Sequence, residues 1–155
     1  VGAVATRLYM PERTTQDLDI IIRSEDRQKV WQKLEAAGFI YQGELNIGGT
    51  SWMTPDGEII DVLEGEETWL PDALAEAQTN LDAQGLPILP LPYLVLMKFR
   101  AGRTLDLSDI TRMLGQADAN QLNAIRNLFA EYHPQEMEDL ESLILLGQME
   151  MQCLK

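Results

Sequence analysis

Apolar and polar positions follow two different periods along the chain, and the change of period divides the sequence into two parts. Residues 17–22 form a short β-branched run, and residues 39–49 and 50–64 hold further strand-like stretches, all typical of β-structure. A Pro-Asp-Gly turn at residues 55–57 separates two of these runs. It predicts a hairpin, because proline presets the turn and glycine tolerates a positive φ.

Helical signals surround these strands and then replace them. Residues 2–10 predict a short helix after a glycine turn, and Ser24 is a candidate cap for a helix that ends at Gly38. Residues 71–80 begin with a proline suited to a first helical turn, whereas the prolines of residues 85–92 favour an extended connection. From residue 92 onward the spacing predicts helices over 92–101, 106–114, 119–132 and 134–152.

This order predicts an α+β (or α/β) fold in which helices flank a small mixed sheet. A chain of 155 residues is long enough to bury one core, so we expect a single domain over residues 1–155. Its mixed-sheet part would span residues 1–90 and its helical part residues 91–155.

Composition narrows the partners and the compartment. Twelve Lys and Arg residues against 25 Asp and Glu residues give a net charge of −13, so nonspecific nucleic-acid binding is not expected. The apolar stretch 86–97 holds three prolines and is too short to span a membrane. The single cysteine, Cys153, excludes an internal disulfide and fits a reducing cytoplasm. Because the chain opens at Val1 in mid-pattern, we expect an upstream segment.

Two carboxylates interrupt the apolar run of residues 17–22. On a strand, Asp17 and Asp19 point to one side while Leu18, Ile20 and Ile22 point to the other. Like charges this close repel unless a cation lies between them, and carboxylate oxygens are ligands that Mg²⁺ prefers. The run therefore predicts a metal site, with a solvated edge strand as the alternative.

Asp61 is a third carboxylate in a similar setting, between Ile60 and Val62 in the second strand of the hairpin. If that strand lies beside the first, three carboxylates converge. Such a set is sufficient for the two-metal arrangement used in phosphoryl and nucleotidyl transfer.

Residues 2–22, GAVATRLYMPERTTQDLDIII, resemble the signature of the polymerase-β-like nucleotidyltransferase superfamily. That signature has a glycine turn, a short helix, Asp-x-Asp on a strand and a third Asp on a later strand. The Arg-x-Thr-x-Asp-x-Asp form, met by Arg13, Thr15, Asp17 and Asp19, is similar to a branch of small stand-alone proteins that includes AbiEii-like toxins of toxin–antitoxin systems. The resemblance implies a nucleotidyltransferase fold and transfer of a nucleoside monophosphate from a nucleoside triphosphate to an unidentified acceptor, with Mg²⁺ or Mn²⁺ as cofactor.

A second stretch, residues 94–114, resembles a helical segment of those proteins in which a lysine precedes Asp-x-x-Asp on the next helix. By that resemblance Lys98 faces the cleft and contacts nucleotide phosphates, while Asp106 and Asp109 fix the two helices or orient Lys98 or the substrate. The residues alone leave two alternatives open: a solvated Lys98, and Asp106 as a helix N-cap.

The resemblance assigns roles to three groups of residues. The metal-binding and catalytic group consists of Asp17, Asp19 and Asp61. The nucleotide-binding group consists of Gly2, Ala3, Arg13, Thr15 and Lys98. The supporting group consists of Asp106 and Asp109. Ala3 departs from the Gly or Ser usual in the family, so a backbone contact to phosphate is kept there and a hydroxyl contact is lost.

Two alternatives accompany the enzyme hypothesis. One is a catalytically weak or inactive member of the fold that acts through protein–protein contacts in a toxin–antitoxin-like system. The apolar patch in residues 141–155 is a candidate surface for such a partner or for a second copy. The other differs only in its acceptor, because an acidic surface suits a cationic small molecule such as an aminoglycoside.

Overall fold

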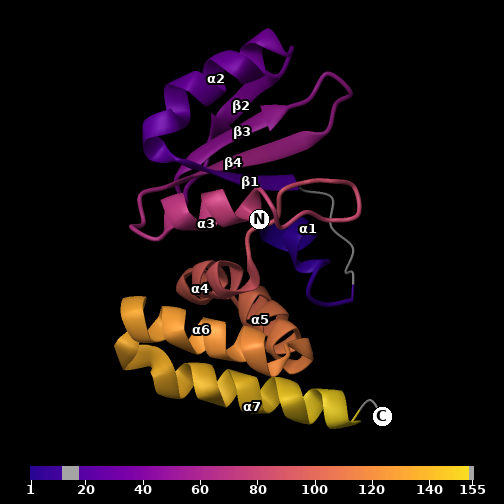
Figure 1. The fold of residues 1–155 in the computed structure, drawn as a ribbon. Coiled ribbons are helices and arrows are strands. Elements are labelled where there is room, and N and C mark those ends of the chain that lie inside the picture. The colour runs from indigo at the N-terminus through magenta and orange to yellow at the C-terminus, as the bar shows by residue number, and fades with distance from the viewer. Residues whose placement is uncertain (12–17, 154–155) are drawn as a thin grey trace.

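A four-stranded mixed sheet occupies one half of the computed structural model, which describes residues 1–11 and 18–153 (Figure 1). The sheet order is β1-β4-β3-β2. Strand β1 pairs parallel with β4, and the other two pairings are antiparallel. The strands are β1 Leu18–Arg23, β2 Ile40–Glu44, β3 Gly49–Met53 and β4 Ile59–Gly65. The predicted α+β fold with a small mixed sheet is therefore confirmed.

The β3–β4 hairpin is confirmed at the predicted turn. The amide of Gly57 donates to the carbonyl of Thr54 at 2.9 Å, and the amide of Glu58 donates to the Thr54 hydroxyl at 3.0 Å. Gly57 adopts a φ of 87°, a value that glycine accepts without steric cost. The turn thus sets the register that aligns β3 with β4.

Helix α2, Arg27–Ala36, covers one face of the sheet (Figure 1). Its Trp31 ring meets Trp52 of β3 edge-on, with ring centroids 4.9 Å apart, and Ile22 and Val62 lie on the same face. Successive strand residues point to opposite faces, so Asp61, the neighbour of Val62, points away from α2. The predicted cap for this helix was wrong: Ser24 lies in a 3₁₀ turn, and its hydroxyl donates to the Gly65 carbonyl at 3.3 Å.

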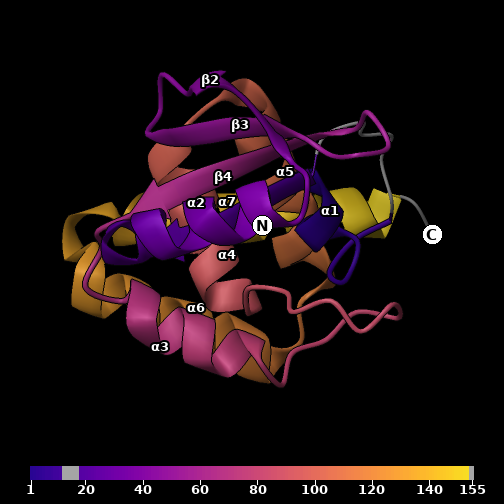
Figure 2. The ribbon, with the colours of Figure 1, turned by 90° about the horizontal axis from the view of Figure 1, so that it is seen from above.

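The other half of the molecule is helical and lies beyond the β1 edge of the sheet (Figure 1). Seen from above, α2 lies in front of α7, and α6 lies behind α3 (Figure 2). The helices outside the sheet layer are α1 Gly2–Thr6, α3 Leu70–Ala77, α4 Leu91–Ala101, α5 Thr104–Gln116, α6 Ala119–Tyr132 and α7 Met137–Cys153.

The main core lies within this helical half. Leu94, Val95, Ile110, Phe129 and Leu140 have no exposed surface, and burying side chains of this size is the main source of stability. Within residues 1–11 and 18–153 no helix has the length and apolar character needed to cross a membrane.

Helices α5 and α7 contact each other through their backbones. A Cβ atom at Gly115 would overlap the carbonyl of Gly147, and a Cβ at Gly147 would overlap the carbonyl of Thr111. Two glycines therefore permit this crossing, which holds α5 in place on the side away from the sheet.

Candidate functional site

Two of the predicted catalytic carboxylates lie side by side on the sheet. In the parallel pairing of β1 with β4, Asp19 is the register partner of Asp61. Partners on adjacent strands point to the same face and are about 4.8 Å apart along the hydrogen-bonding direction. Both residues are partly exposed. The structure thus brings Asp19 and Asp61 together on the face opposite α2, while Asp17, Arg13 and Thr15 lie outside the described residues.

Gly2 lies directly against Asp19. It has a φ of 67°, and a Cβ atom at this position would overlap the Oδ2 atom of Asp19. The amino group of Val1 also donates to the backbone carbonyl of Asp19, at 3.0 Å. Only glycine meets both the backbone conformation and the close approach. The next residue, Ala3, is buried.

Lys98 lies in a buried ion-pair network between α4 and α5. Its Nζ atom donates to Asp106 Oδ1 at 3.1 Å and to Asp109 Oδ2 at 2.9 Å. The side chains are 4%, 3% and 0% exposed, respectively. The alternative of a solvated lysine was therefore wrong, because the helix packing buries the ammonium and pairs it with two carboxylates.

Gly102 allows the turn that brings the members of this network together. Gly102 ends α4 with a φ of 63°, so the chain reverses and the last turn of α4 meets the first turns of α5. Asp106 and Asp109 are three residues apart and share one face of α5. Asp106 is not the cap of that helix, as the alternative had it, since α5 begins at Thr104 and Arg103 occupies the cap position.

Arg103 joins the network from outside. Its Nε and Nη2 atoms donate to the two carboxylate oxygens of Asp106, at 2.6 Å and 3.2 Å, while its side chain remains 70% exposed. Sequence reasoning missed this residue. The signal was present, because an arginine three residues before an aspartate at a helix start can form such a pair.

The charges in the network shift one another's pKa values. Burial alone raises the pKa of Asp106, but hydrogen bonds from Arg103 and Lys98 outweigh burial and bring the pKa below its ordinary value. The hydrogen bond to Asp106 raises the pKa of Arg103, and the carboxylate of Asp19 acts in the same direction. Asp106 and Arg103 are therefore both charged at neutral pH.

Asp19 and the network act electrostatically on common groups. Burial lowers the pKa of the Val1 amino group to about 6; the Asp19 carboxylate opposes this shift and the Lys98 ammonium adds to it. Asp19 acts on Arg103 as well. Arg103, at the corner between α4 and α5, thus lies within electrostatic range of Asp19.

The carboxylate pair fits a magnesium ion in its donor chemistry. Mg²⁺ is usually held by one or two carboxylates, and substrate phosphates and water complete its octahedron. Asp19 and Asp61 supply two such carboxylates on one face. The described part of the chain contains no group of three or more His, Cys, Asp or Glu residues that could hold a metal ion.

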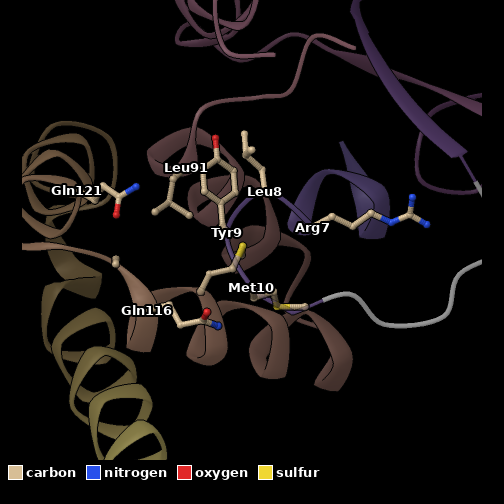
Figure 3. Close-up of a pocket in the computed structure, with 9 residues that line it drawn as sticks. Arg7, Leu8, Tyr9, Met10, Leu91, Gln116 and Gln121 are labelled. Atoms are coloured by element: carbon tan, nitrogen blue, oxygen red, sulfur yellow. The ribbon is translucent and has the colours of Figure 1, made fainter. Parts of the chain in front are cut away.

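A separate cavity of about 330 Å³ lies between the end of α1 and the helical half (Figure 3). The Tyr9 hydroxyl is tied to the chain beside it, donating to the Leu89 carbonyl at 3.2 Å and accepting from Asn80 at 2.7 Å. Among the predicted site residues that the structure describes, none lines this cavity. Its lining consists of Arg7, Leu8, Tyr9, Met10, Leu91, Met113, Gln116, Ala117 and Gln121.

Comparison with known proteins found similarity only among solved structures; no family model and no curated protein matches the chain. The solution structure of the antibiotic-resistance factor ANT(2'')-Ia is 17% identical, with a TM-score of 0.49, over 98% of this chain and 80% of that one. A crystal structure of ANT(2'')-Ia in complex with adenylyl-2''-tobramycin is 18% identical, with a TM-score of 0.46, over 92% and 83%. Likeness at this level says nothing by itself about what this chain does.

Proposed function

We propose that this chain is a metal-dependent nucleotidyltransferase, which moves a nucleoside monophosphate from a nucleoside triphosphate to an acceptor hydroxyl. One observation carries the proposal: Asp19 and Asp61 are register partners on one sheet face, with the backbone of Gly2 against Asp19. Carboxylate oxygens on one face of a sheet are ligands that Mg²⁺ prefers, and one or two carboxylates are enough to hold it together with substrate phosphates.

Asp19 and Asp61 would have different roles, the first in metal binding and the second in proton transfer. Asp19, together with Asp17 as predicted from the sequence, would hold Mg²⁺ or Mn²⁺, which when bound withdraws charge from the triphosphate and lowers the pKa of the acceptor hydroxyl. A carboxylate oxygen of Asp61 would accept the proton from that hydroxyl. The acceptor oxygen then bonds to the α-phosphorus, the bond from that phosphorus to the α–β bridging oxygen breaks, and pyrophosphate leaves.

The remaining predicted residues would bind rather than react. Phosphate contacts from the Gly2 and Ala3 backbone, and nucleotide contacts from Arg13 and Thr15, stay predictions from the resemblance. Little covalent chemistry is required of such a protein, because positioning and charge supply most of the rate.

Asp61→Asn tests the proposal. Wild-type protein is incubated with Mg²⁺, each α- or γ-labelled nucleoside triphosphate, and tRNA or an aminoglycoside as acceptor, and labelled acceptor, self-labelling and pyrophosphate release are measured. Loss of a general base costs about 10²–10⁴ in rate, so Asp61→Asn should lower transfer by at least about 10². The exposed Asp56→Asn is the matched control and should transfer normally. No transfer by the wild type, or full transfer by Asp61→Asn, contradicts the proposal.

One observation favours the alternative of a protein that acts by contact. Leu145, Leu146 and Met149 on α7 are 59%, 48% and 54% exposed, an apolar surface for which a partner protein is one use. The two functions separate if expression in a bacterial host slows growth. Nucleotidyl transfer requires Asp61→Asn to abolish that effect. Action by contact requires Leu145→Glu with Met149→Glu to abolish it and Asp61→Asn to leave it unchanged.

A further inference from the structure

Lys98 is poorly placed to contact a phosphate. An ammonium group has three N–H donors, and two of those on Lys98 are given to Asp106 and Asp109. Its side chain is 4% exposed. Moving the ammonium to a substrate would leave two buried carboxylates without this partner, which is costly.

Arg103 is placed in the opposite way. A guanidinium has five N–H donors, and Arg103 gives two of them to Asp106, so three remain for another acceptor. The side chain is 70% exposed, yet the two-bond contact to Asp106 holds it in one orientation. A planar guanidinium with free N–H groups matches the oxygen geometry of a phosphate.

Asp106, which anchors Arg103, is itself buried and hydrogen-bonded. Asp106 is 3% exposed and accepts from both Arg103 and Lys98, and Lys98 is held by Asp109, which is fully buried. Two cations and two carboxylates make the cluster neutral, so it does not repel an anion. Its exposed member lies within electrostatic range of Asp19.

From these contacts we infer that Arg103 binds the polyphosphate of the nucleoside triphosphate, and that Asp106 is the positioning residue that orients it. The inference rests on the proposed nucleotidyl transfer and adds Arg103 to the residues predicted from the sequence. Lys98 and Asp109 act through Asp106, by fixing its carboxylate between α4 and α5.

Binding of inorganic tripolyphosphate, which carries neither base nor sugar, tests the inference. Tripolyphosphate is titrated calorimetrically into the protein at low salt in the presence of Mg²⁺. It should bind at least tenfold more weakly to Arg103→Gln than to the wild type. Arg103→Lys keeps the charge but loses the planar set of N–H donors, so its affinity for tripolyphosphate should lie between those of the wild type and Arg103→Gln. The control is Arg100→Gln on α4, which removes an arginine that pairs with Glu67 outside the network and should bind as the wild type does.

The positioning role of Asp106 has its own readout. Asp106→Asn should weaken binding less than Arg103→Gln does, and the double variant should bind no more weakly than Arg103→Gln alone, because Asp106 acts only through Arg103. In transfer assays Arg103→Gln should mainly raise the KM for the triphosphate, whereas Asp61→Asn should lower kcat. Melting temperatures of all variants are measured in parallel to show that they fold.

Several results would overturn the inference. Tripolyphosphate binding by Arg103→Gln within twofold of the wild type excludes a phosphate contact, and so does a wild type that does not bind tripolyphosphate at millimolar concentration. Full additivity in the double variant excludes the positioning role. These results differ from failure of the proposed function, which is seen as absence of transfer by the wild type or full transfer by Asp61→Asn.

Discussion

Aspartates occur in both halves of the molecule, but under opposite conditions. On the sheet, Asp19 and Asp61 are partly exposed, and they lie side by side as like charges. Between α4 and α5, Asp106 and Asp109 are buried, and both are bonded to Lys98. The first pair is partly exposed to solvent, whereas the second is buried and paired with Lys98.

The difference follows from the cost of burying charge. A charge that is removed from water needs a partner close by, and once paired it cannot easily take another. A charge that binds a metal ion or a substrate must remain accessible, and two such charges of the same sign repel each other when they lie side by side. The sheet half therefore holds the groups that we propose to react, and the helical half holds groups in place.

The largest expected effect comes from breaking the buried network. Lys98→Met leaves two buried carboxylates without their shared partner, so we expect a loss of about 3–5 kcal/mol in the free energy of unfolding, measured with urea. Lys33→Met on the exposed side of α2 is the control and should change stability by less than about 0.5 kcal/mol. Replacing Lys98, Asp106 and Asp109 together by Met, Asn and Asn should recover part of the loss. A loss below about 1 kcal/mol for Lys98→Met would contradict the view that the buried aspartates depend on Lys98 as their partner.

A pH series isolates the contribution of Asp106. Its folded-state pKa lies below the ordinary value of 3.8, so the stability it contributes is fully present above that value and is lost as the pH falls through the lowered pKa. At pH 6, Asp106→Asn should be about 1.5–3 kcal/mol less stable than the wild type, since it loses hydrogen bonds to a charged group. Urea unfolding between pH 6 and pH 3 should show this gap narrowing at the acid end. A gap that is constant with pH would mean that the ionised carboxylate contributes nothing.

Gly2→Ala tests the sheet side. A left-handed conformation costs a residue with a Cβ about 1–2 kcal/mol, and here the new methyl group must also displace the Asp19 carboxylate. Gly57→Ala is the matched control, with a φ of 87° and nothing within 4 Å of the added Cβ. Gly57→Ala should lose about 1–2 kcal/mol and Gly2→Ala at least as much, but only Gly2→Ala should lower nucleotidyl transfer, by at least about tenfold. Equal transfer by the two would show that the contact between Gly2 and Asp19 has no functional role.

The smallest effect is expected at an exposed ion pair. Arg126 donates to Glu141 at 2.5 Å and 2.9 Å, with side chains 35% and 46% exposed. Arg126→Gln should cost less than about 1 kcal/mol, and less still at 1 M salt, because water and ions screen the pair. The loss in Lys98→Met should be nearly independent of salt. Equal salt dependence in the two variants would remove the distinction between the buried and the exposed pairs.

Most of the fold could be predicted from local patterns. The prediction for residues 119–132 matches α6 in full, because Asp118 and Gln121 form a reciprocal capping box at its start. The hairpin was predicted from its turn residues. The misplaced cap at Ser24 shows the limit, because its hydroxyl bonds to Gly65, 41 residues away in the sequence, rather than to the helix that follows.

The sequence by itself determined which residues could form the site. Strand alternation placed Asp19 and Asp61 within apolar runs, and the glycine turn at Gly2 came before the first of them, since these signals depend on neighbours a few residues apart. Only the tertiary structure decided that β1 lies beside β4 in the register that joins the two aspartates. It alone decided that Lys98 is buried and that Arg103 is exposed, because burial depends on how α4 packs against α5. A buried cation and an exposed cation cannot be told apart from the sequence alone, because the dielectric around each is set by the atoms that surround it in space.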